Sequence, residues 1–138
     1  MSNKEMVQID QGKLSWCLFA LRLGIFIVLA MWSVDKFVNP AHSAAVFAKF
    51  YNINGVGFTA SYILGSLQVL LVLLFLVGFK KRVTYGLVLL IHLASTLVSF
   101  PVYMNGVNSL LFFAAWPMLS ACITLYVLRD ADTRFCLK

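Results

Sequence analysis

Four long apolar stretches, separated by short polar segments, dominate the hydrophobic pattern of this chain. They cover residues 14–34, 57–79, 83–102 and 107–128. A helix rises 1.5 Å per residue, so about 20 apolar residues cross the roughly 30 Å hydrocarbon core of a bilayer. Strands of a membrane barrel would instead alternate apolar and polar residues. The pattern therefore predicts an all-α integral membrane protein with four transmembrane helices, the last of them kinked at Pro117.

The segments between these stretches carry residues that stop a helix or turn the chain. They are an Asn-Pro pair at 39–40, a basic run at 80–82 and an Asn-Gly pair at 105–106. Residues 1–13 mix both charge signs and lead to no cleavage site, so we expect the first helix to persist in the mature protein. The remaining chain is too short for a second domain. We predict a single membrane domain over residues 1–138, folded as a four-helix bundle.

The loop between the first two spans is predicted to contain a short amphipathic helix over residues 40–52. Asn39 is a suitable N-cap, and Pro40 suits the first helical position. Apolar residues then recur at helical spacing: Val46, Phe47, Phe50 and Tyr51. Two roles stay open for this apolar face. It lies in the outer headgroup layer, or it covers the mouth of the bundle.

The composition and the charge distribution support a membrane protein with a defined orientation. Hydrophobic residues make up 62% of the chain, the mean hydropathy is +0.90, and only 12% of residues are charged, which excludes a soluble globular domain. Basic residues gather on one side of the predicted topology: Lys4, Lys13, Lys80, Lys81, Arg82, Arg129, Arg134 and Lys138, against Lys36 and Lys49 on the other. This bias predicts that both termini are cytoplasmic. The net charge of +6 then favours anionic lipid as a partner and not nucleic acid.

The few hydrogen-bonding side chains inside the apolar stretches are the candidate functional residues. Counted inward from the cytoplasmic ends, Arg22 lies about 12 Å deep, Gln68 about 16 Å and His92 about 14 Å. Gln68 continues a stripe of small residues that lets another helix approach, and His92 shares a face with Thr96. We therefore predict one ligand-binding site in the bundle, lined by Arg22, Gln68, His92, Thr96 and Trp116.

Arg22 is the most informative of these residues, because a guanidinium stays charged and a charge inside the bilayer costs several kcal/mol. We expect no carboxylate near it, since Asp35 lies about 20 Å further along the same helix. A site with more donors than acceptors suits a carbonyl or anionic ligand. Two alternatives stay open. Arg22 snorkels to the headgroups, or Gln68 and His92 only hold helices together.

A second polar cluster is predicted at the outer ends of the helices, from Asp35, Lys36, Asn39 and Asn108. We expect Asp35 to contact Asn108 or Lys49. The alternative is that these residues only anchor the helices at the membrane interface.

The sequence contains no self-contained catalytic motif and predicts no metal site. Cys17, Cys122 and Cys136 show no Cys-x-x-Cys spacing, so we expect no disulfide and interpret them as two small apolar fillers and one exposed tail thiol. His42 lies in the outward loop, far in sequence from His92, and no cluster of metal ligands accompanies either residue.

These positions together resemble the DoxX family over essentially the whole chain. The residues that carry the resemblance are Arg22, Asp35-Lys36-Phe37 followed by Asn39-Pro40, Gln68 followed by Gly78-Phe79 and a basic turn, and Asn108. The resemblance implies a small four-helix inner-membrane protein, associated in some members with quinone-linked oxidation of sulfur compounds and in others with redox or metal stress. The family often has an acidic residue where Gln68 stands, so an Arg–carboxylate pair at this level is not implied.

Two classes of function follow from these observations. The first is a membrane subunit of a redox assembly that binds a quinone-like head group, while a separate partner protein brings the electron carrier. The chain has no flavin, haem or nicotinamide motif, so quinone is the candidate cofactor and none is intrinsic. The second class is a non-catalytic scaffold or a carrier for a small solute, in which several copies assemble as a homo-oligomer.

Overall fold

The computed structural model describes residues 8–137, and every regular element among them is helical. The elements are α1 (Gln11–Val38), α2 (Pro40–Tyr51), α3 (Phe58–Leu76), α4 (Lys81–Val98), α5 (Phe100–Tyr103), the 3₁₀ helix η1 (Gly106–Ala114) and α6 (Ala115–Val127). Four stretches are long and apolar enough to cross a membrane: α1, α3, α4, and η1 together with α6. The predicted all-helical, multi-pass membrane protein is therefore confirmed.

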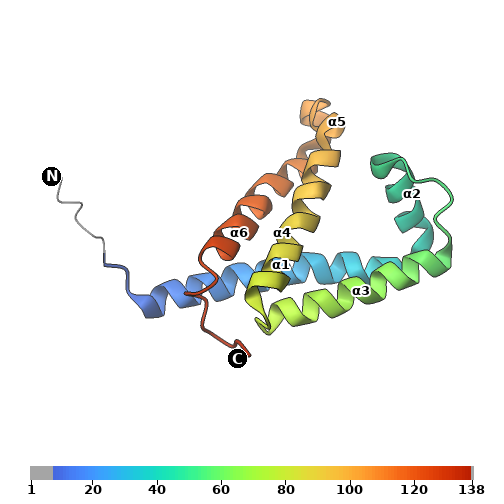
Figure 1. Ribbon diagram of the computed structural model, residues 1–138. Helices are drawn as coiled ribbons and strands as arrows, with labels where there is room; N and C mark the ends of the chain where they lie inside the picture. The colour runs from blue at the N-terminus through green and yellow to red at the C-terminus, as the bar shows by residue number, and fades with distance from the viewer. Residues whose placement is uncertain (1–7, 138) are drawn as a thin grey trace.

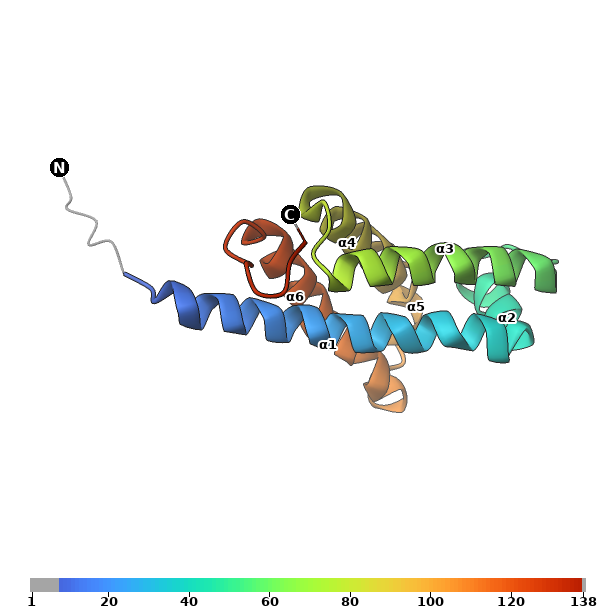
Figure 2. The same cartoon turned by 90° about the horizontal axis from the view of Figure 1, so that it is seen from below.

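The four spans form two antiparallel pairs that meet at one end of the molecule. α1 lies beside α3, and α4 lies beside α6 (Figures 1 and 2). The second pair leans away from the first, so the pairs diverge toward α2 on one side and α5 on the other (Figure 1). We call the end where they meet the tail end, because the chain after α6 lies there. The opposite end of the first pair is the α2 end.

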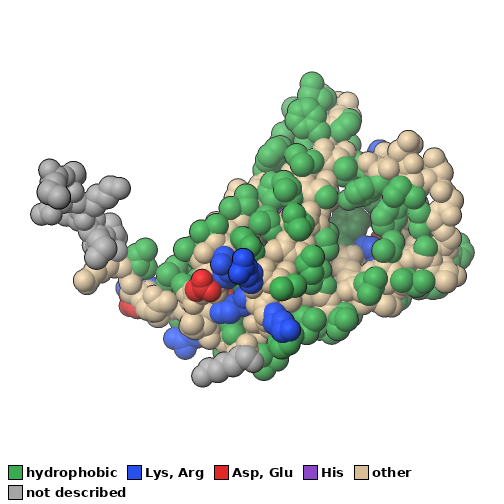
Figure 3. All heavy atoms as spheres, in the orientation of Figure 1, with side chains coloured by type: hydrophobic (Ala, Val, Ile, Leu, Met, Phe, Trp, Pro, Cys, Tyr) green, Lys and Arg blue, Asp and Glu red, His purple; other side chains and the backbone are tan. Residues whose placement is uncertain are grey.

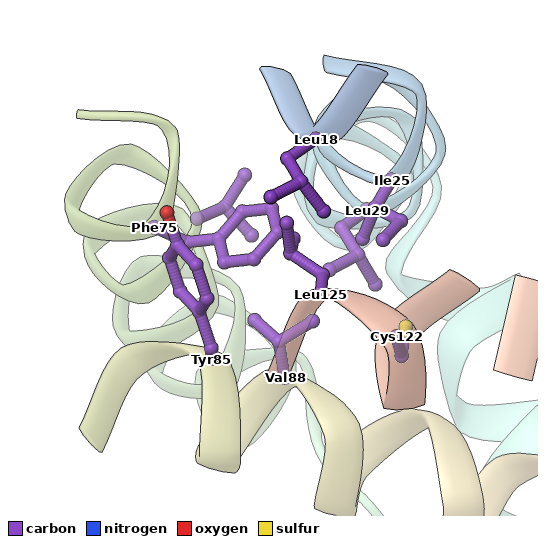
Figure 4. Packing of buried hydrophobic residues seen from close by; sticks show 9 residues of the cluster. Leu18, Ile25, Leu29, Phe75, Tyr85, Val88, Cys122 and Leu125 are labelled. Atoms are coloured by element: carbon purple, nitrogen blue, oxygen red, sulfur yellow. The ribbon is translucent and has the colours of Figure 1, made fainter. Parts of the chain in front are cut away.

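The hydrophobic core lies where the two pairs meet. Its buried residues come from all four spans: Leu18, Ile25, Leu29, Val72, Phe75, Tyr85, Val88, Cys122 and Leu125 (Figure 4). The rings of Phe75 and Tyr85 pack edge to face with centroids 5.0 Å apart. Large apolar side chains remain exposed along the outer faces of the helices, as expected for surfaces that contact lipid. Close four-helix packing is therefore confined to the tail half of the molecule.

The helix ends differ from the sequence-based boundaries for local reasons. α1 begins earlier than expected because the Asp10 side chain accepts hydrogen bonds from the Gly12 and Lys13 amides and so caps the helix. The predicted kink at Pro117 is wrong. Pro117 lies in the first turn of α6, where proline is tolerated, and the non-helical residue of this span is Ser109.

α2 lies between the first two spans and packs against both α1 and α3. Its first turn is fixed by Asn39, whose side-chain oxygen accepts a hydrogen bond from the His42 amide at 3.3 Å. Pro40 occupies the start of the helix, and Asn52 ends it in a left-handed conformation. Ser43 is buried against the spans. This capping brings the first turn of α2 next to the end of α1.

α1 and α3 approach each other closely at Gly65. A Cβ atom on Gly65 would lie 2.9 Å from the Phe37 ring and 3.1 Å from the Lys36 Cβ. We expect Gly65→Leu to lower the free energy of unfolding by about 1–3 kcal/mol through overpacking, measured by thermal unfolding in detergent. Gly24→Leu is the control, because nothing lies within 4 Å of a Cβ at Gly24. Equal melting temperatures for the two variants would contradict this close contact.

Candidate functional site

Arg22 is fully buried at the tail end and forms a salt bridge. Its Nη1 lies 3.0 Å from Oδ2 of Asp132, and neither side chain is exposed. The expectation that no carboxylate lies near Arg22 is therefore wrong. The alternative of a guanidinium that snorkels to the headgroups is also wrong, because Arg22 has no exposed surface.

Three further groups accept hydrogen bonds from the Arg22 guanidinium. Nη1 donates to the Tyr85 hydroxyl at 2.9 Å and to the Cys136 sulfur at 2.8 Å, and Nη2 donates to the Arg134 carbonyl. The Tyr85 hydroxyl in turn donates to Asp132 Oδ2 at 2.7 Å. We call these five residues the Arg22 network. Because all of its acceptors belong to the chain itself, the guanidinium is neutralised without a ligand.

Three of the four acceptors come from the chain that follows α6, which we call the C-terminal segment (residues 128–137); the fourth, the Tyr85 hydroxyl, comes from α4. Lys81 Nζ donates to the Asp132 carbonyl at 2.7 Å, and the Leu137 amide donates to the Val77 carbonyl at 2.8 Å. The hydroxyls of Ser15 and Thr133 are hydrogen-bonded at 2.9 Å. These contacts attach the segment to α1, to α4 and to the turn between α3 and α4.

An aromatic cluster adds apolar contacts to this attachment. The Phe135 ring lies 5.0 Å from the Phe19 ring and 6.1 Å from the Trp16 ring, measured between centroids. The Arg134 guanidinium lies over Trp16 at 4.8 Å. The C-terminal segment is therefore packed on α1 by side chains as well as by hydrogen bonds.

The sequence analysis did not predict that Asp132, Tyr85 and Cys136 contact Arg22. The length of chain after the last span could have indicated that Asp132 reaches Arg22. An extended residue spans up to about 3.5 Å, so the four residues after Leu128 reach about 14 Å. This distance is close to the depth assigned to Arg22. The interpretation of Cys136 as an exposed thiol is wrong, because its sulfur contacts Arg22 and the side chain is only partly exposed.

Gln68 does not meet Arg22, because α1 and α3 are offset along their length. The Arg22 guanidinium lies beside Gly78, where an added Cβ would be 2.9 Å from Nη1. Gln68 lies ten residues earlier, which is about 15 Å along a helix. It is half-buried on the stripe that contains Gly65. The prediction of one shared depth is wrong, because it assumed that all spans start at the same level.

His92, Thr96 and Trp116 lie where α4 meets the start of α6. His92 Nε2 donates to the Ala115 carbonyl at 3.1 Å, and the Thr96 hydroxyl donates to the His92 carbonyl at 2.8 Å. Trp116 is partly exposed and packs on the Tyr103 ring at 5.7 Å. These contacts hold α4 and the last span together and do not include Arg22. A ligand at His92 stays a prediction.

The outer polar cluster is not formed as expected. Asp35 Oδ2 lies 2.7 Å from His42 Nδ1, so its partner is His42 and neither Asn108 nor Lys49. Lys36 Nζ donates to the Trp32 carbonyl at 3.1 Å. Asn39 caps α2, as its place before Pro40 predicted, and the exposed Asn108 makes no side-chain hydrogen bond to the rest of residues 8–137.

The Asp35–His42 pair closes one end of a groove between α1 and the start of α2. The groove has a volume of about 450 Å³, within the usual range for small-molecule sites. The His42 and Trp32 rings are stacked with centroids 6.2 Å apart. Its lining residues are Ile27, Val28, Met31, Trp32, Asp35 and His42. We call it the α1–α2 groove, an apolar surface with one polar pair at its end.

In comparisons with known proteins, no protein-family model, no curated protein and no solved structure matches the chain. Within residues 8–137, no three His, Cys, Asp or Glu side chains are grouped so that they could hold a metal ion. The candidate chemistry therefore has to be argued from the Arg22 network and the α1–α2 groove.

Proposed function

We propose that this chain is a DoxX-like membrane subunit of a redox-linked assembly and that it binds a quinone-like ligand in the α1–α2 groove. The observation that carries the proposal is the Asp35–His42 pair at the end of an otherwise apolar surface. The Arg22 site proposed from the sequence is less suitable, because α4 and the C-terminal segment already supply the acceptors there. The resemblance to the DoxX family supports the same class of function.

The groove matches the chemistry of an aromatic head group with ring oxygens and an apolar tail. With Asp35 accepting from His42 Nδ1, the second ring nitrogen stays free to accept a proton from a hydroxyl or, when protonated, to donate to a carbonyl. The Trp32 ring offers a flat surface for stacking. Ile27, Val28 and Met31 are exposed on one side of α1 and line the groove, and they would contact an isoprenoid tail.

The electron carrier must come from a partner protein in this proposal, because the sequence carries no motif for a redox cofactor. A bound quinone would supply the two-electron chemistry, and His42 with Asp35 would hold or release the proton at the imidazole. The exposed apolar residues of the groove let a lipid-soluble ligand enter sideways from the bilayer.

Orientation is part of the same proposal. Basic residues of the described chain gather at the tail end: Lys13, Lys80, Lys81, Arg82, Arg129 and Arg134. Lys4 and Lys138 lie outside the described residues. The positive-inside rule then puts both termini in the cytoplasm of a bacterial inner membrane and α2 on the outer side, where its apolar face lies at the membrane surface. Protease access to a C-terminal tag in intact and opened cells checks this orientation.

His42→Ala is expected to weaken quinone binding by about 10-fold to 100-fold, because a hydrogen bond to a charged or ionisable group contributes about 1.5–3 kcal/mol. Asp35→Asn should weaken binding in the same direction, since the imidazole loses the group that orients it. The measurement is a titration of the purified protein with a short-chain quinone, in which quenching of tryptophan fluorescence reports binding. Retention of native quinone in mild detergent provides a second readout.

His92→Ala is the control, because it removes the other histidine of the chain, which lies on α4 away from the α1–α2 groove. Binding that is lost with His92→Ala and kept with His42→Ala would move the ligand to the site predicted from the sequence. Binding unaffected by either variant would contradict both sites.

A non-catalytic membrane scaffold is the second candidate, favoured by one observation. The buried Arg22 guanidinium is paired with a carboxylate of the chain itself, as expected where a polar network stabilises a fold and does not bind a ligand. A scaffold would retain its protein partners after His42→Ala and would lose them when the fold of the tail end is disturbed.

A further inference from the structure

A strongly basic groove lies at the tail end, apart from the α1–α2 groove and outside the proposed quinone site. It has a volume of about 560 Å³. Figure 3 shows Lys and Arg side chains gathered around a single acidic group on this part of the surface. The groove is lined by Lys80, Lys81, Arg82, Val83, Arg129 and Asp130. We call it the basic groove; its lining has four cationic side chains and one carboxylate.

The fold brings these cations together from two helix ends. Gly78 and Lys80 both have positive φ values, 63° and 42°, and these reverse the chain sharply before α4. The reversal sets the basic run at the start of α4 beside the end of α6. Arg129 lies two residues after the end of α6, and its Nη1 donates to the Tyr126 carbonyl at 2.8 Å, which holds the side chain in place.

The basic groove also lies at the depth of a membrane interface. α4 begins at Lys81 and α6 ends at Val127, so the groove lies at the start of one apolar span and just past the end of another. Val83 lines the groove and is 55% exposed, which puts an apolar surface next to the cations. A ligand here therefore meets positive charge on one side and hydrocarbon on the other.

We propose that the basic groove is a specific site for the phosphate headgroup of an anionic phospholipid. Ammonium and guanidinium groups donate charge-assisted hydrogen bonds to phosphate oxygens, and basic pockets between spans favour such headgroups. Acyl chains would then run beside Val83 along the outer face of α4. The group that the site recognises is a phosphate anion. The membrane supplies it as a lipid headgroup, and the cytoplasm supplies it as free phosphate.

Lys81 connects the basic groove to the Arg22 network. Lys81 lines the groove, and its Nζ donates to the Asp132 carbonyl. A phosphate bound beside Lys81 offsets the repulsion between neighbouring cations and keeps this lysine next to the C-terminal segment. Binding should therefore raise the melting temperature of the folded protein, since a ligand that binds only the native state stabilises it.

The test compares two double variants of equal charge in the full chain. Arg82→Gln with Arg129→Gln removes two cations of the groove, and Lys13→Gln with Arg134→Gln removes two cations at the same end that do not line it. Native mass spectrometry in detergent, with added phosphatidylglycerol or phosphatidylcholine, counts bound lipids. Melting temperatures are measured with the same lipids and with inorganic phosphate.

We expect one retained phosphatidylglycerol on the wild-type chain, no retained phosphatidylcholine, and a rise in melting temperature with phosphatidylglycerol. The groove variant should bind about 30-fold more weakly, since each Lys or Arg near an anionic lipid contributes roughly fivefold. The control variant should bind phosphatidylglycerol like the wild type and show the same rise in melting temperature, although its lipid-free melting temperature should be lower because Arg134 packs on Trp16. If inorganic phosphate stabilises the wild-type chain and the control variant but not the groove variant, that result would support the same anion site, with free phosphate as its ligand in place of lipid.

Equal losses in the two double variants would overturn the proposal, because they would show general surface attraction and no site. Equal retention of the two lipids would overturn it as well. The charge-conserving variant Arg82→Lys with Arg129→Lys should keep most of the binding, which separates loss of the site from loss of the fold.

Discussion

Replacing Asp132 with alanine is expected to lower the free energy of unfolding by about 3–5 kcal/mol, because the buried Arg22 guanidinium loses the one carboxylate that pairs with it among residues 8–137. The Tyr85 hydroxyl loses its acceptor at the same time. The pairing is already incomplete, since Arg22 Nε and Asp132 Oδ1 are buried without a partner among the described residues. The remaining acceptors are neutral and cannot replace a carboxylate. Unfolding in mixed micelles with increasing SDS measures the effect.

Asp130→Ala is the matched control, because Asp130 lies two residues earlier in the same segment and is exposed. Its loss should change the free energy of unfolding by less than about 0.5 kcal/mol. Asp132→Asn separates charge from size and should be nearly as destabilising as Asp132→Ala. If Asp132→Ala and Asp130→Ala unfold at the same SDS content, Asp132 does not neutralise Arg22 in the folded protein.

Gly78→Ala is expected to lower the free energy of unfolding by about 2–4 kcal/mol for two reasons. Gly78 has a φ of 63°, which is strained for any residue with a Cβ. The added Cβ would also lie 2.7 Å from the Cys136 sulfur and 2.9 Å from Arg22 Nη1. The substitution therefore pushes the C-terminal segment away from the guanidinium, as thermal unfolding in detergent would measure.

Gly24→Ala is the control for this substitution and should have the opposite sign. Gly24 lies within α1 with nothing within 4 Å of an added Cβ, so alanine should stabilise the helix by up to about 1 kcal/mol. Cysteine labelling gives a second readout, because Gly78→Ala should raise the reactivity of Cys136 and leave Cys122 protected. Unchanged Cys136 reactivity in Gly78→Ala would argue against contact between the segment and the α3–α4 turn.

Local properties of the sequence predicted the spans but not the partners of their polar residues. Span length and apolarity are read directly from consecutive residues, so four membrane-crossing helices follow without tertiary information. The depth of Arg22, Gln68 and His92 required the offset between helices as well. That offset depends on contacts such as Gly65 with Phe37 and Gly78 with Arg22, which no single helix encodes.

The α1–α2 groove shows the same division between local and tertiary information. Asn39 and Pro40 were identified as the start of a helix from residue type alone. The pairing of Asp35 with His42 was missed, because it depends on the direction in which α2 leaves α1. That direction is set by the capped turn at Asn39, whose geometry is known only from the folded structure.

By itself the sequence determined a chain of four membrane-spanning helices and the separation of basic residues between two ends, because hydrophobic length and charge act residue by residue. The tertiary structure alone decided that Asp132 neutralises Arg22, that His42 pairs with Asp35, and that two helix ends form the basic groove. The physical reason is that each of these contacts joins residues brought together only when the chain folds back on itself.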